Sequence, residues 1–137
     1  MTDTLLEGGC LCGTVRYRAT GRPVGSAICH CRSCQRASGA PSVAWLTFRS
    51  AELSFPTQAP RSHLSSPGVT RSFCERCGTP LTYRSDQWPD TVDVATATLD
   101  AAAEFPPAKE IWLEHRLPWE PLSDDLPHYP RSSVAET

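Results

Sequence analysis

Seven closely spaced cysteines constrain this chain more than any other feature of its sequence. They form three short groups: Cys10 and Cys12; Cys29, Cys31 and Cys34; and Cys74 and Cys77. Pairs separated by one or two residues let two thiolates reach one ion from a tight turn, as in zinc knuckles. Buried structural cysteines that bind nothing have no reason to cluster at this spacing. The pattern therefore predicts that the chain folds around metal ions.

The alternatives to metal binding are disulfide bonds and a redox-active C-x-x-C pair. An odd number of cysteines cannot be fully paired within one chain. The opening MTDTLLEGG lacks the basic and apolar regions of a signal peptide, and no apolar run is long enough to span a membrane. We therefore expect a cytoplasmic protein in a reducing compartment, where disulfides are disfavoured. No βαβ pattern surrounds either C-x-x-C pair, which disfavours a thioredoxin-like role.

Length and charge narrow the class of protein further. A chain of 137 residues suits a single domain spanning 1–137. The formal net charge of -2 gives no electrostatic reason to expect a nucleic-acid partner or an acidic membrane surface.

The pattern of apolar residues is mostly that of β-strands. Alternation or apolar runs predict strands over 14–20, 41–48, 51–55, 69–73, 80–85, 91–99 and 109–115. The Pro- and Ser-rich stretch 57–68 is predicted to be a loop, as is the tail after Pro118. One or two helical turns are expected over SCQRAS, ending at Gly39. The expected fold is a small, proline-interrupted antiparallel β domain.

Spacing alone allows two ways of dividing the cysteines between metal ions. The favoured one keeps Cys29, Cys31 and Cys34 together as an open set. It leaves a closed set of four, made of Cys10, Cys12, Cys74 and Cys77. The other division joins 31/34 to 74/77 as a zinc ribbon. It needs an unusually long insert and leaves Cys29 unused.

The motifs GGCLCGTVRY, CHCRSCQRASGAP, AWLTF, FCERCGTPL and TLD, in this order, resemble the glutathione-dependent formaldehyde-activating enzyme family, which includes centromere protein V. The resemblance covers about residues 7–127, although Glu110 stands where the family's pattern suggests His. It implies a β-tent fold of small sheets and two zinc ions per chain. In that arrangement Cys10, Cys12, Cys74 and Cys77 hold a structural zinc, and the other three cysteines hold an active-site zinc.

Three protein ligands and one open position are typical of a catalytic zinc site. Three thiolates make zinc a weak Lewis acid, so the site is better suited to a soft thiolate ligand than to making hydroxide. The resemblance supplies the reaction, in which glutathione and formaldehyde give S-(hydroxymethyl)glutathione, with carbon–sulfur lyase activity in reverse. The expected partners are therefore a small thiol such as glutathione and an aldehyde. Candidate substrate contacts are His30 and Arg36, while Trp45 is expected in the core and Trp112 and Trp119 as packing anchors.

A second class of function is also compatible with the sequence. Domains of this fold also serve as interaction proteins, so a zinc-stabilised protein-binding module without catalytic activity is the alternative. The intact Cys29, Cys31 and Cys34 set favours the enzyme, because a binding module needs only the four-cysteine site.

Overall fold

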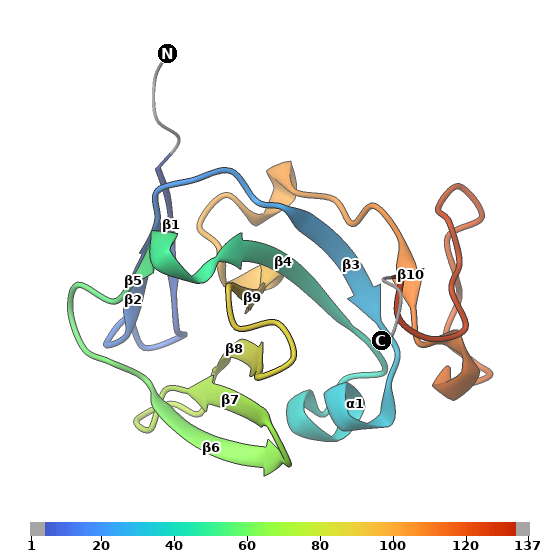
Figure 1. Cartoon of the computed structure of the whole chain (residues 1–137), viewed down its shortest axis with the longest axis horizontal. Coiled ribbons are helices and arrows are strands. Elements are labelled where there is room, and N and C mark those ends of the chain that lie inside the picture. The colour runs from blue at the N-terminus through green and yellow to red at the C-terminus, as the bar shows by residue number, and fades with distance from the viewer. Residues whose placement is uncertain (1–4, 134–137) are drawn as a thin grey trace.

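The computed structural model describes residues 5–133, and these form a mainly β structure (Figure 1). Its strands are β1 (Leu6–Gly9), β2 (Arg16–Ala19), β3 (Gly25–Cys29), β4 (Val43–Arg49), β5 (Leu53–Ser54), β6 (Arg61–Ser66), β7 (Val69–Phe73), β8 (Pro80–Ser85), β9 (Thr91–Ala95) and β10 (Glu110–Ile111). The helical elements are α1 (Arg32–Ser38) and the 3₁₀ turns η1 (Ser50–Glu52), η2 (Thr96–Thr98), η3 (Ala102–Glu104) and η4 (Leu113–His115). No helix within the described residues has the length and apolar character needed to cross a membrane.

The strands form two sheets. The smaller has the order β1-β2-β5, and the larger has the order β10-β3-β4-β9-β8-β7-β6. All pairs are antiparallel except β10 with β3, where the C-terminal segment joins the edge of the larger sheet in a parallel register. This pairing brings Glu110 and Ile111 alongside Ile28 and Cys29. Figure 1 shows β10 next to β3. Apart from an isolated parallel bridge between Glu110 and His128, this pairing is the one departure from the expected antiparallel arrangement among the described residues.

The register of the larger sheet determines which side chains point into the core and which point to the opposite face. Residues that pair directly across antiparallel strands point to the same face. Leu46 pairs with Val94 and Phe48 with Val92, and these four side chains pack against buried residues of the smaller sheet such as Tyr17. The opposite face carries an unbroken cross-strand row that is largely polar: Gly25, Thr47, Asp93, Tyr83 and Arg71. The core therefore lies on one side of the sheet and leaves the other free to build a site.

Helix α1 is short and held at both ends. At its start, the Cys34 backbone N–H donates to the Sγ of the N-cap residue Cys31, 3.3 Å away. At its end, Gly39 takes a left-handed conformation with φ of 74°, which a residue without a Cβ adopts easily. The Gln35 side chain, buried in the helix, donates to the backbone oxygens of His30 and His115. The helix is thereby fixed to both the cysteine loop and the C-terminal segment.

Most strand predictions are confirmed, with three corrections. The predicted loop 57–68 contains β6, an edge strand whose residues are all exposed. The predicted strands over 91–99 and 109–115 are shorter, because each ends in a 3₁₀ turn. The stretch 51–55 likewise begins within η1 and leaves only two strand residues. The predicted helical turns over SCQRAS, ending at Gly39, are confirmed.

Candidate metal centres and the adjoining cleft

The structure brings the seven cysteines into two groups, the division that spacing favours. Within each group, the sulfur atoms all lie within 4.8 Å of one another, and all seven thiols are free. One group consists of Cys10, Cys12, Cys74 and Cys77, and the other of Cys29, Cys31 and Cys34. The zinc-ribbon division is not the arrangement in the structure, because 31/34 and 74/77 belong to different groups.

The four-cysteine group has the dimensions of a closed metal site. Zinc–sulfur bonds of about 2.3 Å in a tetrahedron place sulfurs roughly 3.8 Å apart. The Cys12 Sγ lies 3.6 Å from that of Cys10 and 3.8 Å from that of Cys74. Backbone N–H groups of Val15 and Cys77 donate to the sulfurs of Cys10 and Cys74. Donors aimed at sulfur stabilise thiolates, so this group could hold a metal ion.

The three-cysteine group is built from the end of β3 and the start of α1. Cys29 is the last residue of the strand, while Cys31 caps the helix that contains Cys34. Cys29 and Cys34 are buried at 5% and 3% exposure, and Cys31 is partly exposed. The pKa of Cys34 is lowered, first by hydrogen bonds from Cys29 and Cys31 and then by Arg71. The lowered pKa favours the thiolate form of Cys34, the form in which cysteine binds metals.

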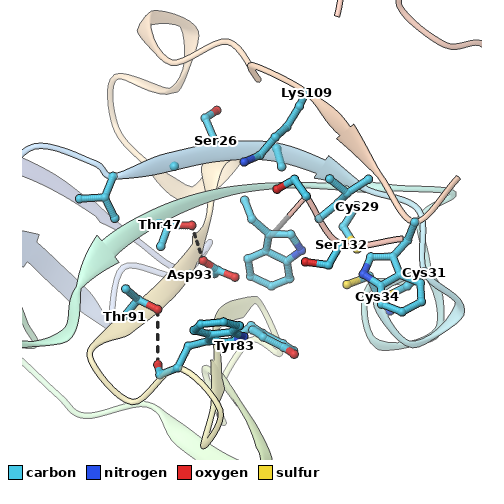
Figure 2. Close-up of a pocket in the computed structure, with 18 of the residues that line it drawn as sticks. Ser26, Cys29, Cys31, Cys34, Thr47, Tyr83, Thr91, Asp93, Lys109 and Ser132 are labelled. Carbon is cyan, nitrogen blue, oxygen red and sulfur yellow. Dashed lines mark hydrogen bonds between the residues drawn. The ribbon is translucent and has the colours of Figure 1, made fainter. Parts of the chain in front are cut away.

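All three of these cysteines line one end of a cleft of about 540 Å³. A cavity of that size accommodates a small organic ligand. Figure 2 shows the cysteines near Ser132 at one end, with Thr47, Asp93 and Thr91 towards the other. Aromatic side chains supply much of the wall: Trp45, Tyr83, Trp88 and Trp112. Cys10, Cys12, Cys74 and Cys77 take no part in lining this cleft, whereas all three members of the other group face it.

Trp112 reaches this wall through a strained backbone. Among residues 5–133 it alone of the non-glycine residues has a positive φ, at 59°. A bulky residue rarely adopts this conformation, which costs on the order of 1–3 kcal/mol. Its ring stacks on that of His115 with centroids 5.6 Å apart and packs beside the three-cysteine group. The strain thus coincides with the placement of an aromatic wall against the candidate metal centre.

Asp93 is the buried carboxylate of the cleft, and its role could not be recognised from the sequence. Its side chain accepts a hydrogen bond of 2.5 Å from the Thr47 hydroxyl (Figure 2). Burial raises the pKa of Asp93, and the negative charge of Cys34 adds to that rise, whereas Thr47 and Lys109 oppose it. Lys109 and the exposed Asp90 line the same cleft, so the cavity offers two carboxylates and one basic group. The signal in the sequence was a carboxylate alternating with Val92 and Val94, on the strand face opposite to theirs.

A buried arginine stands beside the three-cysteine group on its other side. Arg71, on β7, is only 6% exposed. One of its guanidinium nitrogens, Nη2, lies 3.7 Å from the Cys34 sulfur, and Nε lies 3.3 Å from the Ser65 hydroxyl. Its guanidinium also lies 5.0 Å from the centre of the Tyr83 ring. Arg71 and Cys34 both border a second cavity of about 460 Å³.

The two predicted substrate contacts lie outside the cleft lining. His30 is buried, and its Nε2 lies 2.8 Å from a carboxylate oxygen of Glu110. Arg36 is exposed on α1 and lines neither cavity. Trp45 is buried as expected, yet it also forms cavity wall. Trp119 is 69% exposed, so its prediction as a packing anchor is wrong.

Three comparisons with known proteins agree with these features. The family model described as glutathione-dependent formaldehyde-activating enzyme matches residues 5–115. A protein of Halomonas elongata named "Putative glutathione-dependent formaldehyde-activating enzyme" is 32% identical over 147 aligned positions, covering 96% of this chain and 93% of its own length. A crystal structure of a Rhodobacter sphaeroides protein superimposes with a TM-score of 0.59 at 20% identity. That match covers 69% of this chain and 88% of the other, and it supports the fold alone.

The family match extends over most of the described chain and contains both cysteine groups and Asp93. The match to the relative runs nearly the full length of both chains. The chain therefore belongs to the glutathione-dependent formaldehyde-activating enzyme family.

Proposed function

We propose that this protein is a zinc-dependent enzyme that forms and cleaves the carbon–sulfur bond of thiol–aldehyde adducts, a carbon–sulfur lyase in the cleavage direction. The observation that carries the proposal is the unequal placement of the two cysteine groups. Three sulfurs face a cleft large enough for a small thiol, whereas the other four lie outside that lining. The family description and the name of the Halomonas relative make glutathione and formaldehyde the first pair to consider.

The donor sets fit two different uses of zinc. The four sulfurs of Cys10, Cys12, Cys74 and Cys77 suit a closed structural site. The set of Cys29, Cys31 and Cys34 leaves one tetrahedral position for a ligand from the cleft. When bound there, zinc would supply affinity for a soft thiolate sulfur and favour the deprotonated form of that thiol.

The residues of the cleft suit the rest of the chemistry. Trp45, Tyr83 and Trp112 surround the cysteine end with aromatic surface, which excludes water from a reactive aldehyde. We assign Asp93 to proton movement, since it is a carboxylate of raised pKa in the same cleft. Lys109 suits a carboxylate of the substrate.

Cleavage of the adduct can be written as a balanced step in which Asp93 accepts the proton. The Asp93 carboxylate takes the proton from the adduct hydroxyl, and the O–H electron pair becomes the second bond of the aldehyde carbonyl. The carbon–sulfur bond breaks with its pair leaving on sulfur, as thiolate. Formation is the reverse, with Asp93 returning the proton to the oxygen as sulfur adds to the carbonyl carbon.

The test is a calorimetric titration of the zinc-loaded protein with glutathione and then with other cellular thiols. Each is titrated with and without formaldehyde. Binding should tighten as pH rises towards the pKa of the thiol, because capture as thiolate releases a proton. Cys34→Ser should lose thiol binding and keep the fold, since the four-cysteine group is separate.

Two outcomes of that titration would count against the proposal. One is equal thiol binding by the wild type and Cys34→Ser. The other is no binding of any thiol to wild-type protein that carries both zinc ions. Either result would favour a binding module stabilised by zinc.

A further inference from the structure

Arg71 is a buried, positively charged side chain that has no role in the proposed reaction. A guanidinium stays protonated in proteins, so a buried arginine is a buried cation. Such a charge needs an anionic partner or its desolvation is not offset. Yet no ion pair within 4.0 Å in the described chain includes Arg71. The Ser65 hydroxyl and the Tyr83 ring are neutral, which leaves Cys34 as the acidic group in contact.

The three-cysteine centre carries the charge that Arg71 lacks. Three thiolates around a divalent ion leave one net negative charge, and the guanidinium cancels it. The contact of 3.7 Å between Nη2 and the Cys34 sulfur is within the range of a hydrogen bond to sulfur. An N–H donor there stabilises the negative charge that the sulfur carries.

The four-cysteine group has no comparable need for a buried positive charge. That group is more negative once it holds a divalent ion, yet Cys12 is exposed to solvent. Hydroxyls of Thr14 and Thr79 also lie 3.2 Å from the sulfurs of Cys12 and Cys77. Water and hydroxyl dipoles can stabilise that charge. Each group has two buried cysteines, but the three-cysteine group has no exposed member like Cys12, and a fixed cation takes over the same task.

We propose that Arg71 is the built-in counter-charge of the three-cysteine zinc centre, and that it sets how tightly that centre holds its metal. Because its position on β7 is fixed by pairing with Tyr83 on β8, the charge stays in place while ligands enter and leave through the cleft. Arg71 is a positioning residue, since it borders the second cavity and reaches the metal only through Cys34. The inference rests on the proposed zinc at this centre.

The experiment measures zinc affinity in the absence of thiol and aldehyde. Zinc-loaded protein is titrated with a chromophoric chelator, and the ion lost from the three-cysteine centre is assigned by its absence in Cys34→Ser. Arg71→Gln and Arg71→Met should release this ion at chelator activities about 10- to 100-fold lower than wild type, as loss of an outer partner commonly does. Arg71→Lys keeps the positive charge and should lose much less. Arg84→Met, an exposed arginine on the neighbouring strand, is the matched control and should match wild type.

The contrast between Gln and Lys keeps the test decisive if Arg71→Met does not fold, because both retain a polar, flexible side chain. Equal zinc affinity in wild type and Arg71→Gln would overturn the inference, as would equal losses in Arg71→Lys and Arg71→Gln. If wild type binds no zinc at the three-cysteine centre, this inference and the proposed function fail together. Zinc binding that depends on Arg71 without any reaction of thiol and aldehyde would sustain the inference and overturn only the proposed function.

Discussion

His30 and Glu110, 80 positions apart in the chain, form a buried side-chain contact of 2.8 Å between Nε2 and Oε1. Both side chains are at most 2% exposed. The other oxygen of Glu110 accepts a hydrogen bond of 2.6 Å from the Ser123 backbone N–H. The pair therefore ties the loop between Cys29 and Cys31 to the C-terminal segment, beside the parallel strand β10.

Glu110→Ala should destabilise the protein, because it removes the partner of the buried His30 ring and of the Ser123 backbone N–H. Each polar group left unpaired costs about 1–3 kcal/mol. Chemical denaturation of the zinc-loaded protein measures the change. Glu114→Ala breaks a more exposed ion pair with Arg131 and should cost within about 1 kcal/mol. A loss for Glu110→Ala no larger than that of this control would contradict a structural role for the buried pair.

Cys77→Ser should leave a protein that is largely unfolded or insoluble. The closed site joins the segment after β1 to the segment after β7, and a structural zinc contributes on the order of 10 kcal/mol to folding. Circular dichroism across a thermal ramp gives the readout. Cys34→Ser is the matched control, because it removes one sulfur from the other group and should still unfold cooperatively. Cooperative unfolding of Cys77→Ser near the wild-type midpoint would refute a structural metal.

Purified protein should contain close to two zinc ions per chain, and a strong chelator should remove them in order. The three-cysteine ion should leave first, since its open position admits a competing ligand from the cleft. Native mass spectrometry during chelation follows the two steps. Simultaneous loss of both ions, or one ion per chain with every thiol reduced, would contradict the open-site reading.

The two cysteine groups could be predicted from sequence because their members lie close together in the chain. Cys29, Cys31 and Cys34 lie on one strand end and one helical turn, so their spacing nearly fixes their geometry. Only the pairing of 10/12 with 74/77 depends on long-range folding. For that pairing, spacing alone also allowed the zinc-ribbon division. The structure selects the favoured division.

The rest of the site depends on strand register, which spacing does not encode. Arg71, Tyr83, Asp93 and Thr47 come from four strands and meet because neighbouring residues pair across the sheet. Each looks like an ordinary polar position on its own strand. Arg36 was a natural candidate because it is close to the cysteines in sequence, yet the turn of α1 leaves it exposed. Strand β6 was missed for a related reason: an exposed edge strand has no buried face to produce an apolar alternation.

Asp93→Asn should lower the rate of adduct formation and cleavage by about 10²- to 10⁴-fold, the usual contribution of a positioned acid or base. It should also stabilise the protein at neutral pH. Because burial raises the pKa of Asp93, the folded protein holds this proton more tightly than the unfolded chain does. The resulting stability is present below the ordinary carboxyl pKa and is lost as pH rises through the raised value. The Asn side chain carries no charge to desolvate and can still accept from Thr47.

The stability gap between Asp93→Asn and wild type should therefore widen as pH rises from about 4, by about 1.4 kcal/mol for each unit of pKa elevation. Denaturation of both proteins across that pH range measures it, and Asp86→Asn, at an exposed position, should show no comparable trend. An Asn variant that is inactive but as stable as wild type at every pH would support the catalytic role of Asp93 and contradict the predicted effect of its buried charge on stability. An Asn variant of wild-type activity would remove Asp93 from the mechanism, because an amide cannot take the hydroxyl proton on which cleavage depends.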